Sequence, residues 1–134
     1  MRNLGRIDEK ARFEDAYHAI GRCAEAFYLI APIIPRALNI VVQRIYGRYD
    51  EALFHVFKAS NTFDYEEKVC SLEKAHECLF SLQTSFEILV KGHGCSVGQA
   101  NVVIDATREA YIQVNKWLNK IIKDKANESS VIES

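Results

Sequence analysis

Basic side chains at helical spacing are the feature of this 134-residue chain best suited to a binding chemistry. Arg36, Arg44 and Arg48 fall within about 120° of one face of a helix that turns 100° per residue. A second group, Lys116, Lys120 and Lys123, recurs near the C-terminal end. Such stripes can neutralise phosphates without reading base sequence. They also suit a solvated face that forms surface ion pairs, and charge alone favours this plainer interpretation because the net charge is −1.

Acid and histidine pairs are the candidates for a metal site. Glu73 and His76 match the E-x-x-H pattern that di-metal sites use in helical bundles. Asp15 and His18 make a poorer second copy, because aspartate is the shorter acid. No further pair of inward-facing glutamates is evident, so surface acids beside half-buried histidines are the favoured interpretation, and we expect no metal.

Cysteine and catalytic motifs also point away from an active site. His93 and Cys95 supply too few ligands for zinc, and a turn that happens to contain them is favoured. No C-x-x-C pair, P-loop, G-x-S-x-G or G-x-G-x-x-G is present, and no nucleophile is paired with a base. We therefore expect a protein that is not an enzyme and has no cofactor. Without a secretory signal at the N-terminus, we expect reduced thiols and a cytoplasmic location. The cysteines are Cys23, Cys70, Cys78 and Cys95.

Four amphipathic segments must position these residues. Apolar side chains recur at steps of three and four over about 8–31, 35–59, 64–91 and 96–125, which predicts helices. Pro32 ends the first segment and Pro35 suits the first turn of the second. Asp64 with Glu67, and Ser96 with Gln99, resemble capping boxes that begin the third and fourth.

The connections are short, so neighbouring helices should pack antiparallel. We predict an all-α fold, an antiparallel up-down-up-down four-helix bundle over 8–125, with a flexible N-terminus at 1–7 and a disordered tail at 126–134. No apolar run is long enough to span a membrane. Tyr46, Phe57 and Phe63 suggest more apolar surface than a lone bundle hides, which favours a homo-oligomer.

Two stretches carry a resemblance to a known family. The first is FYLIAPIIPRALNIVVQRIYGRYDEALF, in which Ile34, Pro35 and Arg36 follow the apolar run YLIAP. The second is HGCSVGQANVVIDATREAYIQVNKWLNKI, which begins with His93-x-x-Ser96-x-x-Gln99 and has Trp117 near its end. Over roughly 13–125 the chain resembles the accessory variability determinant (Avd) proteins of diversity-generating retroelements. These belong to a four-helix-bundle family that includes proteins encoded in intervening sequences of ribosomal RNA genes.

The resemblance implies a function. Such proteins form pentameric barrels, bind the reverse transcriptase and template RNA of the element, and support mutagenic reverse transcription and retrohoming without an active site. Carried over, the polar contacts to RNA or to the polymerase would be Arg36, Arg44, Arg48, Lys116, Lys120 and Lys123. The best-known Avd type is strongly basic, whereas this chain has a pI of about 6.4. We therefore expect binding to concentrate on the local basic stripes or on the reverse transcriptase.

A second function stays open. The chain could equally be an oligomeric four-helix-bundle scaffold that binds another protein and has no nucleic-acid role, as intervening-sequence family members could be. Salt-sensitive retention of RNA separates the two, because only phosphate contacts weaken steeply with salt.

Overall fold

The computed structural model describes the backbone of residues 2–133 and the side chains of 9–128. It contains four α-helices and, among the described residues, no strand, which confirms the predicted all-α class with four helices. The helices are α1 (Arg2–Ile30), α2 (Asn39–Ser60), α3 (Tyr65–Lys91) and α4 (Val97–Glu133). Two 3-10 turns, η1 (Ala31–Ile33) and η2 (Arg36–Leu38), connect α1 to α2.

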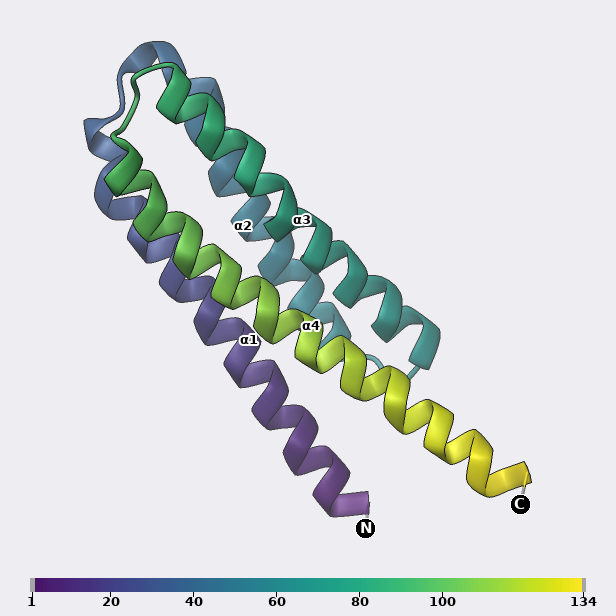
Figure 1. Cartoon of the computed structure of the whole chain (residues 1–134). Helices are drawn as coiled ribbons and strands as arrows, with labels where there is room; N and C mark the ends of the chain where they lie inside the picture. Colours follow the sequence, from purple (N-terminus) through teal and green to yellow (C-terminus); the bar gives the residue numbers. More distant parts are fainter. Residues whose placement is uncertain (1, 134) are drawn as a thin grey trace.

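The four helices pack as neighbours around one core. The main contacts join α1 to α2, α2 to α3, α3 to α4 and α4 to α1, so α2 and α4 lie diagonally across the core. Figure 1 shows the connections 31–38 and 92–96 at one end of the molecule and the connection 61–64 at the other. The C-terminal turns of α4 extend beyond α3 in the same view.

The helix boundaries differ from the predicted ones at several points. The second helix was predicted to start at Pro35, but Leu38 has φ −103° and ψ 14°, and α2 begins only at Asn39. Arg36 therefore lies in the separate turn η2 rather than on the face of α2. Residues 2–7 and 126–133 continue α1 and α4 as helix, whereas Met1 and Ser134 lie outside the described residues. The predicted flexibility of both ends stays a prediction.

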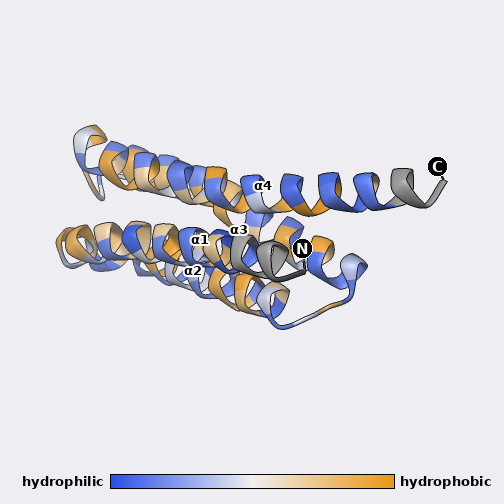
Figure 2. Ribbon diagram, turned by 90° about the horizontal axis from the view of Figure 1, so that it is seen from below, coloured by the Kyte–Doolittle hydropathy of each residue, from blue (hydrophilic) through white to orange (hydrophobic). Residues whose placement is uncertain are grey.

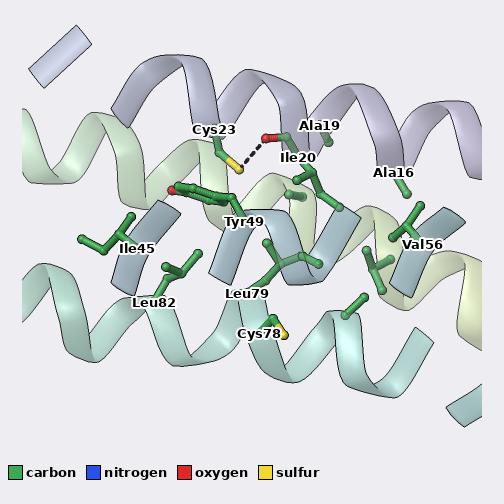
Figure 3. Close-up of a cluster of buried hydrophobic side chains, with 14 of the residues drawn as sticks. Ala16, Ala19, Ile20, Cys23, Ile45, Tyr49, Val56, Cys78, Leu79 and Leu82 are labelled. Carbon is green, nitrogen blue, oxygen red and sulfur yellow. Dashed lines mark hydrogen bonds between the residues drawn. The ribbon is translucent and has the colours of Figure 1, made fainter. Parts of the chain in front are cut away.

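The apolar stripes become the core. Trp117, Tyr49, Phe27 and Phe86 are among its largest fully buried side chains. Figure 2 shows hydrophobic residues recurring along every helix among hydrophilic ones, as the amphipathic pattern requires. In Figure 3 buried side chains from α1, α2 and α3 gather in this core along several turns of the helices.

One small polar cluster lies within the core. The hydroxyl of Thr107 donates to the Val103 carbonyl at 2.8 Å, so the Tyr49 hydroxyl, 3.0 Å from it, donates to Thr107. The Cys23 thiol donates to the Ile20 carbonyl at 3.1 Å, beside Tyr49 (Figure 3). These polar groups are thereby satisfied without water.

The two predicted capping boxes have different outcomes. At α4 the box is confirmed: Gln99 N–H donates to Ser96 Oγ at 3.1 Å, and Ser96 N–H donates to Gln99 Oε1 at 2.9 Å. At α3 the predicted box is wrong, because Asp64 makes no side-chain cap bond. The hydroxyl of Thr62 makes the hydrogen bonds before α3 instead: it accepts from Asp64 N–H at 3.3 Å and donates to Glu67 Oε2 at 2.8 Å.

The turn after α3 contains a strained residue. His93 has φ 60°, a left-handed conformation that costs L-residues roughly 1–2 kcal/mol and glycine very little. We expect His93→Gly to raise the free energy of unfolding by about 1 kcal/mol, measured by urea denaturation. Gly94→Ala should lower it, because the added Cβ would lie 2.7 Å from Leu38 Cδ1 and 3.2 Å from the backbone oxygen of Leu89, so both a side chain and a helix carbonyl would have to shift. An unchanged or lowered stability for His93→Gly would contradict the assigned strain.

Candidate functional site

The first basic group lies near the end of the bundle formed by residues 31–38. Arg36 and Arg44 are exposed and make no ion pair among the described side chains. Arg48 is half-buried, and its Nη1 donates to Glu51 Oε2 at 3.1 Å. Arg44 and Arg48 are four residues apart and so share one face of α2. Arg36 and Arg44 are therefore the residues of this group most available to a partner.

Glu51 ties Arg48 to the neighbouring helix, which the sequence did not indicate. The Cys78 thiol on α3 contacts Glu51 Oε2 at 3.4 Å, so Glu51 bridges both side chains. Burial, reinforced by the Glu51 carboxylate, raises the pKa of Cys78 to about 11. The guanidinium of Arg48 is thus held by Glu51 and is also partly exposed at the surface.

The second basic group lies in the C-terminal half of α4. Lys116 and Lys123 are exposed and make no ion pair among the described side chains. Lys120 is half-buried and pairs with Asp124 at 3.4 Å. Lys125 Nζ lies 5.5 Å from the centre of the Tyr65 ring, a cation–π contact with α3.

The structure does not bring the two basic groups together. Arg44 and Arg48 belong to α2, which lies diagonally across the core from α4, and Arg36 lies in the turn η2 before α2. Arg44 is within two turns of the start of α2, whereas Lys116 is more than five turns into α4, and both helices start at the same end of the molecule (Figure 1). At about 1.5 Å per residue, Lys116 is therefore roughly 20 Å farther along the bundle than Arg44, and about 15 Å farther than Arg48. The groups form two separate basic surfaces.

Exposed apolar side chains accompany the first group. Tyr28, Leu29, Ile33 and Ile40 are 62–77% exposed and surround the α1–α2 connection that also carries Arg36. Elsewhere Phe57 and Phe63, expected to add apolar surface, are indeed exposed, whereas Tyr46 is half-buried. No helix among the described residues is long and apolar enough to cross a membrane.

The predicted metal candidates gain no further ligands. His76 packs on Tyr111 with ring centres 3.9 Å apart, and its Nε2 is buried without a hydrogen-bond partner. In the described part of the chain, no group of three or more His, Cys, Asp or Glu side chains could hold a metal ion. Glu73 and His76 therefore have no third candidate ligand among the described residues, and the same holds for His93 and Cys95.

Two histidines make stability depend on pH. Burial lowers the pKa of both His55 and His76 below the ordinary value of 6.5. As the pH falls below 6.5, the unfolded chain therefore binds more protons at these histidines than the folded chain does. Their neutral forms cost no stability above pH 6.5, and the free energy of unfolding decreases as the pH falls toward the folded pKa values. We expect His76→Gln to flatten this dependence in urea titrations above and below pH 6.5. An unchanged slope would contradict the contribution of His76.

The cysteines should differ sharply in reactivity. Burial raises the pKa of Cys23 to about 11, whereas Cys70 is exposed. Only the thiolate reacts, so we expect iodoacetamide at about pH 8 to label Cys70 at least about 100-fold faster than Cys23 in the folded protein. Mass spectrometry of digested peptides, with and without urea, measures both rates. Equal labelling of the two in the folded state would contradict the burial of Cys23.

Comparison with known proteins gave no relatives: no family model matches the chain, and no similar protein was found among the curated proteins or the solved structures. Function is therefore inferred from the sequence motifs and from the placement of charged and apolar side chains.

Proposed function

We propose that this chain is a non-catalytic accessory protein of a diversity-generating retroelement. It binds the reverse transcriptase and the template RNA, and thereby supports mutagenic reverse transcription and retrohoming. The family resemblance over residues 13–125 suggests this role. The observation that carries it is that Arg36, Arg44, Lys116 and Lys123 are exposed and make no ion pair among the described side chains. Neither the core nor a surface ion pair accounts for them.

The separation of the two basic groups suggests that each binds a different partner. Exposed aromatic and aliphatic side chains beside Arg36 suit a protein surface, because apolar anchors flanked by arginine are typical of protein interfaces. We assign this end to the reverse transcriptase. The α4 group offers mainly lysines, which act as point charges for phosphate, and we assign it to the RNA backbone.

The proposal extends to the assembly. Antiparallel up-down-up-down packing is supported by the connections at alternating ends of the molecule (Figure 1). A homopentamer follows from the resemblance, and exposed residues such as Phe54 and Phe57 provide apolar surface for self-association. The expected location is the cytoplasm.

Co-purification tests this function. The tagged chain is expressed with the reverse transcriptase and the template RNA of the proposed retroelement. We expect both to be retained at low salt, and the RNA to be lost as salt rises while the polymerase stays bound, because phosphate contacts are the most salt-sensitive. Retention of neither component at any salt concentration would refute the proposal.

The alternative is an oligomeric scaffold for another protein, without a nucleic-acid role. The exposed apolar residues around the α1–α2 connection favour it, as does the net charge of −1. It predicts self-association together with no salt-sensitive RNA retention. The same co-purification therefore separates the two functions.

A further inference from the structure

A groove of about 330 Å³ runs between α3 and α4, which lie side by side in Figure 1. Its lining is mainly apolar and includes Leu79, Phe86 and Ile104. Two further lining residues, Phe80 and Ile112, are 62% and 39% exposed. Small-molecule sites in proteins are concave, mostly apolar and of about this size.

Among its mainly apolar lining, the groove along the α3–α4 seam has one uncharged polar residue from each helix. On α4 the seam has Thr107, whose hydroxyl is held by Tyr49 and by the Val103 carbonyl. A short side chain fixed by two hydrogen bonds cannot rotate to fill space. On α3 the seam has Gln83, which is exposed and makes no hydrogen bond among the described side chains. The gap spans about two turns of each helix, roughly 10 Å.

Arg108 is the charged residue of the lining. Its nearest acid is Asp105 at 3.8 Å, and the two side chains are 60% and 74% exposed. An exposed pair at this distance contributes little, about 0–1 kcal/mol, so the guanidinium can exchange Asp105 for another carboxylate. Asp105 itself does not line the groove. Arginine binds carboxylates through two parallel hydrogen bonds, which gives a ligand both affinity and orientation.

We propose that this groove binds a small amphiphile with an apolar body of roughly 10 Å and one carboxylate that pairs with Arg108. The apolar body would cover Phe80 and Ile112, which are otherwise exposed to water. None of the six predicted RNA- or partner-binding residues lines the groove, so this site is independent of the proposed function.

Calorimetric titration of the full chain tests the proposal with three probes of equal chain length. These are decanoate and decyltrimethylammonium, kept below their micelle concentrations, and decanol, kept below its solubility limit. We expect decanoate to bind at one site per chain, decanol about tenfold more weakly, and the cation more weakly still. Arg108→Gln should weaken decanoate about tenfold and leave decanol unchanged. Equal affinity of decanoate and decanol for the unaltered chain would overturn the role of Arg108.

A variant that fills the groove tests its location. Gln83→Phe places a large ring in the seam and should abolish binding, whereas Gln43→Phe, the same change at an exposed position of α2, should not. Circular dichroism confirms that each variant is folded. If Gln83→Phe does not fold, the decanoate and decanol comparison in Arg108→Gln decides the question. Three results would each overturn the proposal. The first is wild-type affinity for decanoate in folded Gln83→Phe, and the second is no decanoate binding by the unaltered chain. The third is a lower sedimenting mass for Gln83→Phe, because that result marks a second copy of the chain as the occupant of the groove.

Discussion

Replacement of Trp117 by alanine is expected to lower the free energy of unfolding by about 3–5 kcal/mol. Trp117 is fully buried and packs against Phe13, with ring centres 6.1 Å apart. Phe13 in turn contacts Phe57 and Tyr17, so this aromatic cluster joins α4 to α1 and α2. Small domains have only about 5–15 kcal/mol of stability in total, so the loss would remove a large part of it.

Urea denaturation followed by circular dichroism measures this loss, since the single tryptophan is no longer available as a fluorophore. Phe63→Ala is the matched control: Phe63 is 95% exposed, and its loss should change stability by no more than about 0.5 kcal/mol. Trp117→Phe should cost much less than Trp117→Ala, because the buried Nε1 has no hydrogen-bond partner to lose. Similar values for Trp117→Ala and Phe63→Ala would contradict the assigned core.

Charge reversal of Arg44 and Arg48 to glutamate is expected to abolish the complex with the reverse transcriptase. The double change converts two positive charges on one face of α2 into two negative ones, and juxtaposed like charges cost several kcal/mol at an interface. Pull-down of the polymerase by the tagged chain measures the loss. Retention at the wild-type level would show that this face does not bind the polymerase.

Three control variants separate binding from folding. Arg48→Glu breaks the pair with Glu51 and places two acids three residues apart, which should cost only about 0.5 kcal/mol. Arg44→Glu alone breaks no ion pair among the described side chains and should still weaken the complex. Reversal of Arg12 and Arg22 on α1 changes the net charge by the same amount and should leave the complex intact.

The sequence predicts local features of this fold well. Helical periodicity locates all four helices, and the Ser96–Gln99 box marks the start of α4, because both depend on residues a few positions apart. Pro35 predicted the start of the second helix less well. Its ring fixes its own φ at −59°, but this gives no information about Leu38, whose conformation interrupts the helix three residues later. The left-handed residue of the Gly-His-Gly turn is His93. The sequence could not show this, because either of the two glycines beside it could adopt that conformation more easily.

Features that depend on contacts between helices could not be predicted. Glu51 reads as a surface acid, yet it joins Arg48 to Cys78 on the next helix. The basic residues were found from helical spacing, but their division between diagonal helices requires the packing order. The groove is lined by residues of both α3 and α4, among them Gln83 and Thr107, and neither residue is unusual by itself.

The salt dependence of template-RNA binding tests the central claim most directly. The purified chain with its reverse transcriptase is titrated with template RNA over a range of salt concentrations, and the unaltered chain is compared with Lys116→Gln/Lys123→Gln. We predict that the affinity falls steeply with salt for the unaltered chain, and that the slope of log K against log salt shrinks by about 1.4 in the double variant. RNA binding with no salt dependence, or with the same slope in both proteins, would contradict the account.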